Sequence, residues 1–105
     1  MYRATTPTHT VGFPVDTSTC EIIKVIYKQG GTKLIKQKTN SETPEGMTLD
    51  GNKVVIKLTQ EETMLFNAKS FVRVQVRVKK TNGDVFNSQK WAIHVDDGLD
   101  EEILE

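Results

Sequence analysis

The amino-acid sequence lacks most features that would mark a secreted, fibrous or membrane-spanning protein. It holds a single cysteine, Cys20, among 105 residues, so no disulfide can form within the chain, which agrees with a reducing compartment. Its longest apolar runs, such as residues 54–56, are a few residues long, which excludes a membrane-spanning helix. Three prolines and seven glycines exclude a fibrous repeat. The opening MYRATTPTHT has no apolar stretch of the kind found in secretory signals, so we expect the chain to be made and kept in a cytosol.

No set of residues has the spacing of a catalytic or metal site. The residue types of a cysteine nucleophile with its base are present as Cys20, His9, His94 and Asp96. Nothing in the sequence brings these four together, and a lone cysteine beside a strand start is usually a small buried hydrophobe. A metal site needs three or four well-spaced ligands, which two distant histidines and one cysteine do not supply. We therefore expect a protein that is not an enzyme and has no cofactor and no metal.

Period-two alternation, the pattern of half-buried β-strands, recurs along the chain. In FVRVQVRVKK, from residue 71, every second residue is valine, and most residues between them are polar or cationic. In EIIKVIYKQ, from residue 21, one face is apolar and the other carries Lys24 and Lys28. In THTVGFPV, from residue 8, Phe13 falls on the apolar side. Pro14 predicts that this last strand lies at a sheet edge or breaks near its end.

Two turn signals predict how strands are joined, and the strand after the second turn has an irregular pattern. Gly30 and Gly31 tolerate the positive φ of a tight hairpin turn. Asn82 and Gly83, between two strand-like runs, predict a type I′ hairpin turn with positive φ at both positions. The return strand DVFNSQKWAIHV places Trp91 among apolar residues of one parity, which predicts a core position for it. Two polar residues share that parity, so either a bulge shifts the register or the middle of the strand lies at an edge.

One segment departs from the strand pattern. Thr59 followed three residues later by Glu62 matches a capping box, in which a hydroxyl and a carboxylate satisfy free amides at a helix start. We expect a short helix over residues 60–66. Some of its last apolar side chains should pack onto the core, namely among Met64, Leu65 and Phe66.

These patterns predict an all-β domain, because six or seven short strands occur with turn signals about every ten residues and no βαβ spacing. At this length the expected architecture is an immunoglobulin-like antiparallel β-sandwich of 6–8 strands, and a small β-barrel is the alternative. We expect one β-sandwich domain over residues 1–95, followed by an acidic C-terminal tail over residues 96–105. The chain has no room for a second domain.

Charge is distributed unevenly although the formal net charge is zero. Six of the 14 acids lie in residues 96–105, which hold no base, so the preceding residues carry 14 bases against 8 acids. If neighbouring strands align, the cations of two strands form one stripe, comprising Arg73, Arg77, Lys79, Lys24 and Lys28. Such a stripe suits a phosphate backbone, but single-strand binders also need exposed aromatics, and only Phe71 and Phe86 are near. A solvated face or a protein contact is the favoured interpretation, and nucleic-acid binding is the alternative.

The acidic tail has two interpretations. In the first it is a frayed end. In the second it is ordered or bound to a partner, because Leu99, Ile103 and Leu104 supply an apolar anchor. Its acids would then meet a basic patch on this chain's own sheet or on a neighbour. We favour the second interpretation.

Several segments together resemble small proteins encoded in prophages of Gram-positive gut bacteria: RATTPTHTVGFPVD, GNKVVIKLTQEETMLF, VRVQVRVKKTNGDVFNSQKWAIHV and GLDEEIL. Their layout is similar to the N-terminal β-sandwich modules of phage baseplate proteins. The resemblance implies a virion or tail component that is made in the bacterial host cytoplasm, joins the virion on assembly, and binds other phage proteins or itself. It assigns no role to any residue. Such β-modules pair their sheet edges and termini with neighbours.

Three functions therefore compete. The first is a non-enzymatic structural or assembly protein of a phage. The second is a small nucleic-acid-binding β-domain that uses the lysine and arginine face. The third is a small enzyme or a carbohydrate-binding module. A sugar platform would need Trp91, Tyr2 and Tyr27, of which we expect at least two to lie in the core.

Overall fold

The computed structural model describes residues 1–12, 14–40 and 42–105 and consists mainly of β-strands. Phe13, expected on the apolar side of the first strand, lies outside the described residues. In chain order the elements are β1 (Thr8–Gly12), η1 (Thr17–Thr19), β2 (Cys20–Gln29), β3 (Thr32–Thr39), β4 (Met47–Asp50), β5 (Lys53–Lys57), α1 (Gln60–Thr63), β6 (Ser70–Lys80), β7 (Val85–Asn87) and β8 (Trp91–Val95).

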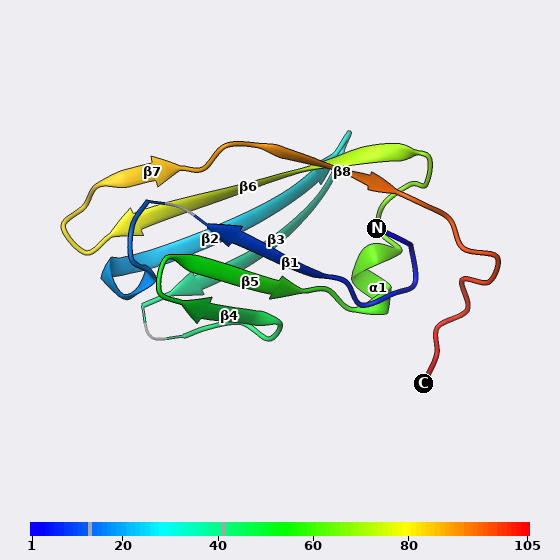
Figure 1. The fold of residues 1–105 in the computed structure, drawn as a ribbon, viewed down its shortest axis with the longest axis horizontal. Coiled ribbons are helices and arrows are strands. Elements are labelled where there is room, and N and C mark those ends of the chain that lie inside the picture. The colour runs from blue at the N-terminus through cyan, green and yellow to red at the C-terminus, as the bar shows by residue number, and fades with distance from the viewer. Residues whose placement is uncertain (13, 41) are drawn as a thin grey trace.

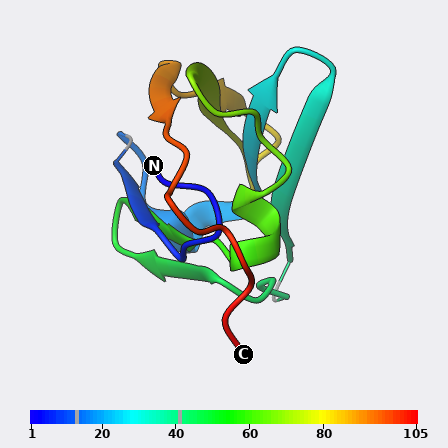
Figure 2. The same cartoon turned by 90° about the vertical axis from the view of Figure 1, so that its right-hand side faces the viewer.

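The strands form two antiparallel sheets that pack face to face (Figures 1 and 2). The smaller sheet has the order β1-β5-β4, and the larger has the order β3-β2-β6-β7, with β8 paired to β6 on the same edge as β7. These orders correspond to strands B-E-D and C′-C-F-G of an immunoglobulin sandwich. The predicted all-β sandwich is therefore confirmed. The barrel alternative is wrong, because the two described sheets remain separate layers.

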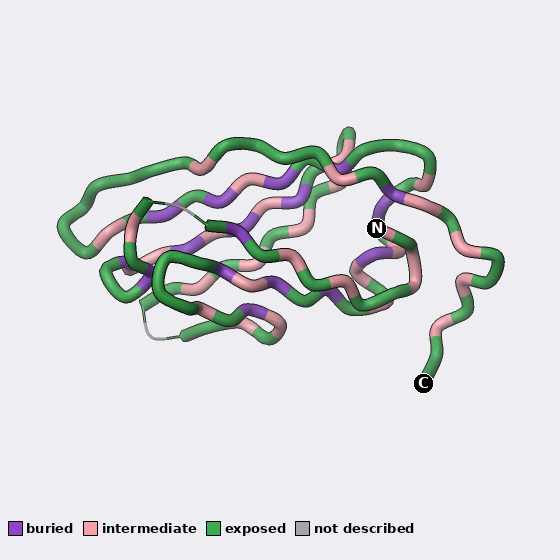
Figure 3. The backbone as a smooth tube through the Cα atoms, viewed as in Figure 1, coloured by how far each residue is buried: buried purple, intermediate pink, exposed green. Residues whose placement is uncertain are grey.

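The core lies between the sheets, where the alternating apolar positions meet. The four valines of β6 are at most 3% exposed, and Ile23, Val25 and Tyr27 of β2 are fully buried. The smaller sheet contributes Val54 and Ile56 from β5. Figure 3 shows buried positions alternating with exposed or intermediate ones along these strands. Each buried valine stabilises the fold by about 1.5–3 kcal/mol, so this alternation fixes which face of each strand points inward.

The predicted capping box is present, but the helix is shorter than expected. The Thr59 hydroxyl accepts from the Glu62 amide at 3.1 Å, and the Glu62 carboxylate accepts from the Thr59 amide at 2.8 Å. The α-helix ends at Thr63, and bonds between residues three apart then tighten the chain as far as Phe66. This turn buries Phe66 beside Tyr27 and leaves Leu65 half exposed. Burial of Phe66 in the core therefore outweighs continuation of the α-helix beyond Thr63.

Both predicted hairpins form, but one has a different turn. Gly30 has a φ of 54°, and the two-residue turn pairs Gln29 with Thr32, as expected. At the second hairpin only Gly83 has a positive φ, of 96°, so the type I′ prediction is wrong. The Lys80 carbonyl accepts from the Gly83 amide and the Lys80 amide donates to Asp84, which defines a three-residue loop with a bulge. The Asn82 side chain accepts from the Asp84 amide at 3.0 Å, and this bond stabilises the longer loop.

The return strand is both bulged and at an edge. It pairs Arg77 with Asn87 but Val74 with Trp91, so one extra residue lies between β7 and β8. Ser88 bridges the gap, because its hydroxyl accepts from the Val76 amide at 2.9 Å. Trp91 has the inward parity, but its strand is the outermost of the sheet. It is 38% exposed, so the core position expected for it is wrong.

The exposure of Trp91 also changes the expectation for the sugar platform. Trp91 opens onto a hollow of about 380 Å³ between β1 and β8. Tyr2 is also exposed, so Tyr27 is the only one of the three proposed sugar-platform residues in the core, where at least two were expected.

Among the described residues, no helix is long and apolar enough to cross a membrane.

Candidate functional site

The outward surface of the larger sheet carries the cations that the sequence singled out. We call this outward surface the basic face, and its cationic side chains are Lys24, Lys28, Lys33, Arg73, Arg77, Lys79 and Lys90. All except Lys24 are exposed, and Lys24 is partly buried. The inward valines force this arrangement, because successive residues of β6 must point to opposite sides of the sheet. The five cations predicted to form a stripe therefore share one surface.

The register places several of these cations directly beside one another. Lys28 of β2 pairs with Lys33 of β3 on one side and with Arg73 of β6 on the other, which forms a row of three cations. Lys24 pairs with Arg77 in a second row. Directly opposed residues of antiparallel strands have Cβ atoms about 4.5–5.5 Å apart, and like charges in such pairs are destabilising.

No carboxylate relieves this repulsion within the part of the chain that the structure describes. The ion pairs there involve the N-terminus, Arg3, Lys36 and His94, and none involves the basic face. Arg77 donates from Nε to the neutral Asn87 side chain at 2.9 Å, which orients the guanidinium but leaves its charge uncompensated. The basic face is therefore a surface on which an external anion would lower the energy.

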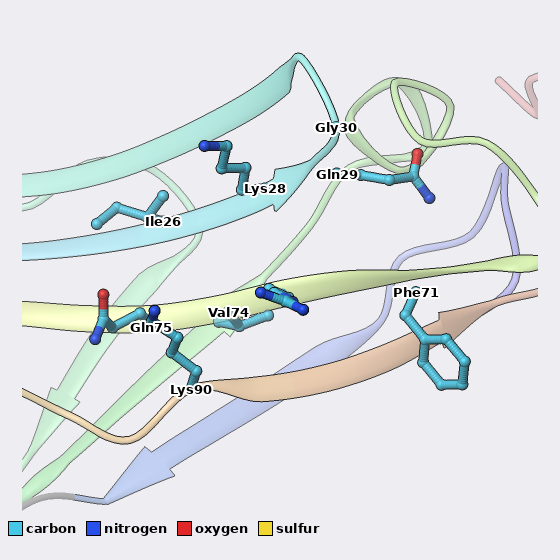
Figure 4. Close-up of a pocket in the computed structure, with 9 residues that line it drawn as sticks. Ile26, Lys28, Gln29, Gly30, Phe71, Val74, Gln75 and Lys90 are labelled. Atoms are coloured by element: carbon cyan, nitrogen blue, oxygen red, sulfur yellow. The ribbon is translucent and has the colours of Figure 1, made fainter.

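A hollow of about 530 Å³ lies at one end of the basic face. Figure 4 shows its walls: Ile26 and Lys28 come from β2, Gln75 and Phe71 from β6, and Lys90 from the bulged segment. Phe71 is 58% exposed, and its ring meets the His94 ring edge-on with centroids 5.1 Å apart. Apolar and amide groups thus lie among the cations at this end of the sheet.

Between the two cation rows runs a less polar row formed by Ile35, Ile26 and Gln75. Ile35 is 41% exposed. Ile22 pairs with Lys79 at the far side of the second row. The basic face therefore alternates cationic rows with partly apolar ones, and it offers a partner both charge and apolar contact.

The two aromatic candidates for base stacking do not share this surface. Phe71 is on the basic face, since it shares the outward parity of Arg73. Phe86 pairs with the inward-facing Val78, so it belongs to the opposite side of the sheet. A single strand of nucleic acid would therefore find only one of the two expected aromatic rings on the basic face.

The acidic tail is held against the body, but not by the residues expected to anchor it. Leu99 and Leu104 are exposed and Ile103 is partly buried, so the two leucines do not anchor the tail on the described part of the same chain, and their contact with a neighbour stays a prediction. The tail is held instead by a 2.8 Å ion pair between Glu101 and Arg3. In addition, the Gln60 side chain donates to the Leu104 carbonyl at 2.8 Å and accepts from its amide at 2.9 Å.

The structure does not bring Cys20 together with His94 and Asp96, which could have served as its base. Cys20 is buried and pairs with Lys80 at one end of β6, whereas His94 pairs with Phe71 at the other end. His94 contacts Asp96 at 2.9 Å, and both are exposed enough to meet solvent. Among the described residues there is no group of three or more His, Cys, Asp or Glu side chains that could hold a metal ion.

His9 and Tyr27 form a polar contact inside the sandwich. His9 Nδ1 lies 2.7 Å from the Tyr27 hydroxyl oxygen. Burial, and then the charge of the N-terminus, lower the pKa of His9. Burial, and then the charge of Glu62, raise the pKa of the Tyr27 phenol. Both side chains are therefore neutral near pH 7, and the partly buried His9 satisfies the hydroxyl of the buried Tyr27.

Two residues of the basic face were missed in the sequence. Lys33 had a detectable signal, because a two-residue turn at Gly30 and Gly31 fixes the pairing of Lys28 with Lys33. Lys90 had none, since its position depends on the bulge between β7 and β8.

No protein-family model matches the chain, and no curated protein matches it. These two comparisons therefore add no functional evidence to the basic face or to the resemblance of the sequence segments.

Proposed function

We propose that this chain is a non-enzymatic structural or assembly protein of a phage, and that the basic face docks an acidic protein partner. The observation that carries the proposal is the row in which Lys28 stands between Lys33 and Arg73, none of which forms an ion pair among the described residues. A folded domain loses stability by opposing like charges in this way, and an anionic partner would recover it.

The apolar residues among the cations favour a protein partner over solvent alone. Cations that only keep a sheet soluble need no apolar neighbours, yet Ile26 and Ile35 lie side by side between the two cation rows. Protein interfaces combine apolar groups at the centre with polar groups at the rim and are enriched in arginine. The basic face shares two of these features, a central apolar row and two arginines, although most of its cations are lysines.

The phage setting rests on the resemblance to prophage-encoded β-sandwich modules. Under this proposal the protein is made in the bacterial host cytoplasm and becomes part of a tail or baseplate. The test is the gene neighbourhood. Adjacent capsid, tail or holin genes would support the setting, and a neighbourhood of unrelated metabolic genes would contradict it.

Nucleic-acid binding is the second candidate, and the hollow beside Phe71 supports it. Lys28, Arg73 and Lys90 surround this hollow, so one base could stack on Phe71 while its phosphates meet cations. It ranks second, because only one of the two expected aromatic rings lies on the basic face.

Fluorescence anisotropy of two labelled probes, decaglutamate and a decamer of thymidylate, separates the candidates. We expect the wild-type chain to bind decaglutamate more tightly than the oligonucleotide. The double variant Lys28→Gln with Arg73→Gln should weaken decaglutamate binding about 5- to 30-fold, since each exposed charge pair contributes about 0.5–1 kcal/mol.

The matched control is Lys53→Gln with Lys57→Gln, which removes the same charge from exposed positions of β5 in the smaller sheet. It should bind decaglutamate like the wild-type chain. Equal weakening by the two double variants would mean that only net charge matters, and it would overturn the assignment to the basic face. Tighter binding of the oligonucleotide would favour the second candidate.

A further inference from the structure

We propose that the acidic partner is a second copy of this chain, whose C-terminal tail docks on the basic face. This inference rests on the proposed function, because it names the partner of the same surface. The docking segment is the acid ridge, which we define as the exposed acids and leucines after β8: Asp97, Leu99, Asp100, Glu102, Leu104 and Glu105.

The acid ridge is presented on a fixed support. Glu101 pairs with Arg3 at 2.8 Å, and Gln60 binds both backbone groups of Leu104. The Asp100 side chain also accepts from the Glu102 amide at 2.9 Å, which shapes the bend between these supports. A segment that is already ordered loses less conformational entropy on docking than a flexible tail would.

The two surfaces match in charge and in apolar pattern. The acid ridge carries four acids and no base, and Leu99 and Leu104 lie among them. The basic face carries cations and no acid at its paired positions, with isoleucines among them. Leu99 and Leu104 are 111% and 74% exposed, so these side chains are available for contact.

The same copy does not satisfy its own basic face in this structure. The tail bonds to Arg3 and Gln60, at the end of the sandwich where β8 leaves the sheet (Figure 2). No described tail acid forms an ion pair with the basic face. A contact between ridge and face therefore joins two copies through different surfaces. Such head-to-tail contacts form rings when the rotation closes and open chains when it does not.

Sedimentation velocity of the full chain tests this contact, over a roughly hundredfold range of concentration. We expect association that grows with concentration at about 25 mM salt and weakens about tenfold or more at about 500 mM salt, because the Debye length shortens. The face variant, Lys28→Glu with Arg73→Glu, and the ridge variant, Asp97→Lys with Glu102→Lys, should each be monomeric when alone.

Mixing the two variants provides the decisive measurement. The acidic face of one then meets the basic ridge of the other, so the mixture should associate although neither component does. A variant that merely misfolded would not regain association on mixing. Association of the wild-type chain that neither variant weakens would overturn the proposed contact.

The binding experiment with decaglutamate separates the failure of this inference from failure of the proposed function. A wild-type chain that stays monomeric at low salt but still binds decaglutamate through Lys28 and Arg73 would overturn only the second-copy partner. A chain that neither self-associates nor binds decaglutamate would overturn both proposals. Self-association that occurs only when the thymidylate decamer is present would assign the basic face to nucleic acid.

Discussion

Cations occur on both faces of the larger sheet, but they are treated differently on the two faces. On the inward side of β3, Lys36 bonds the Glu62 carboxylate at 2.6 Å and Lys38 donates to the Cys20 carbonyl at 2.7 Å. On the outward side, Lys28 and Arg73 have only other cations as charged cross-strand neighbours. The chain thus supplies partners for cations near the core and leaves those of the basic face uncompensated. The inward cations therefore contribute to the fold, and under the proposed function the outward ones remain available for a contact.

The largest expected effect separates the two faces of one strand. Val76→Ala should lower the free energy of unfolding by about 2–3 kcal/mol, because it removes buried methyl groups and leaves a cavity. Arg77→Ala, at the next position but on the outward face, should change it by less than about 0.5 kcal/mol. Chemical denaturation of both variants measures the contrast. Similar losses in the free energy of unfolding from the two substitutions would contradict the difference between the inward and outward faces of β6.

A smaller effect is expected from breaking the ion pair between Lys36 and Glu62. Burial alone would raise the pKa of the Glu62 carboxyl, but hydrogen bonds from Lys36 and Thr59 and the Lys36 charge lower it overall. A carboxyl with a lowered pKa in the folded state stabilises the fold above its ordinary pKa, and this contribution is lost as the pH falls through the folded-state value. We therefore expect Glu62→Gln, which keeps the capping bond, to cost about 0.5–1 kcal/mol near pH 7.

Denaturation as a function of pH checks this expectation. The cost of Glu62→Gln should vanish in acid, where the wild-type carboxyl is also protonated. Glu61→Gln is the control, because Glu61 is exposed and forms no ion pair in the described structure. A cost that stays constant into the acid range would show that the charge of Glu62 contributes nothing.

The smallest expected effect has the opposite sign. Lys28→Glu places an acid between Lys33 and Arg73, so at low salt it should raise the free energy of unfolding by about 0.5 kcal/mol. The gain should shrink at high salt. The same substitution should weaken decaglutamate binding, so that stability and binding change in opposite directions. A lower free energy of unfolding for Lys28→Glu at low salt would mean that the opposed cations do not destabilise the wild-type fold.

The sequence predicts well where the signals are local. The capping box at Thr59 and Glu62 depends on residues three apart, and the turn at Gly30 fixes the pairing beside it. The alternation of β6 identifies its buried valines without knowledge of their neighbours. Prediction was wrong at Asn82, where a side-chain bond to Asp84 stabilises a longer loop, and at Trp91, where position in the sheet overrides parity.

The candidate site follows the same division. Lys24, Lys28, Arg73, Arg77 and Lys79 could be assigned to outward positions from alternation alone. The meeting of Lys28 with Arg73 and of Lys24 with Arg77 could not, because it requires β2 to lie beside β6 across many residues of intervening chain.

By itself, therefore, the sequence determined the two-sided character of each strand and the separation of a basic body from an acidic tail, since both depend on the order of residues along the chain. The tertiary structure decided which strands are neighbours. It thereby brought like charges side by side, exposed Trp91 at an edge and attached the tail through Arg3 and Gln60. These outcomes depend on long-range pairing, in which the burial of the valines and isoleucines outweighs the repulsion that it creates on the opposite face.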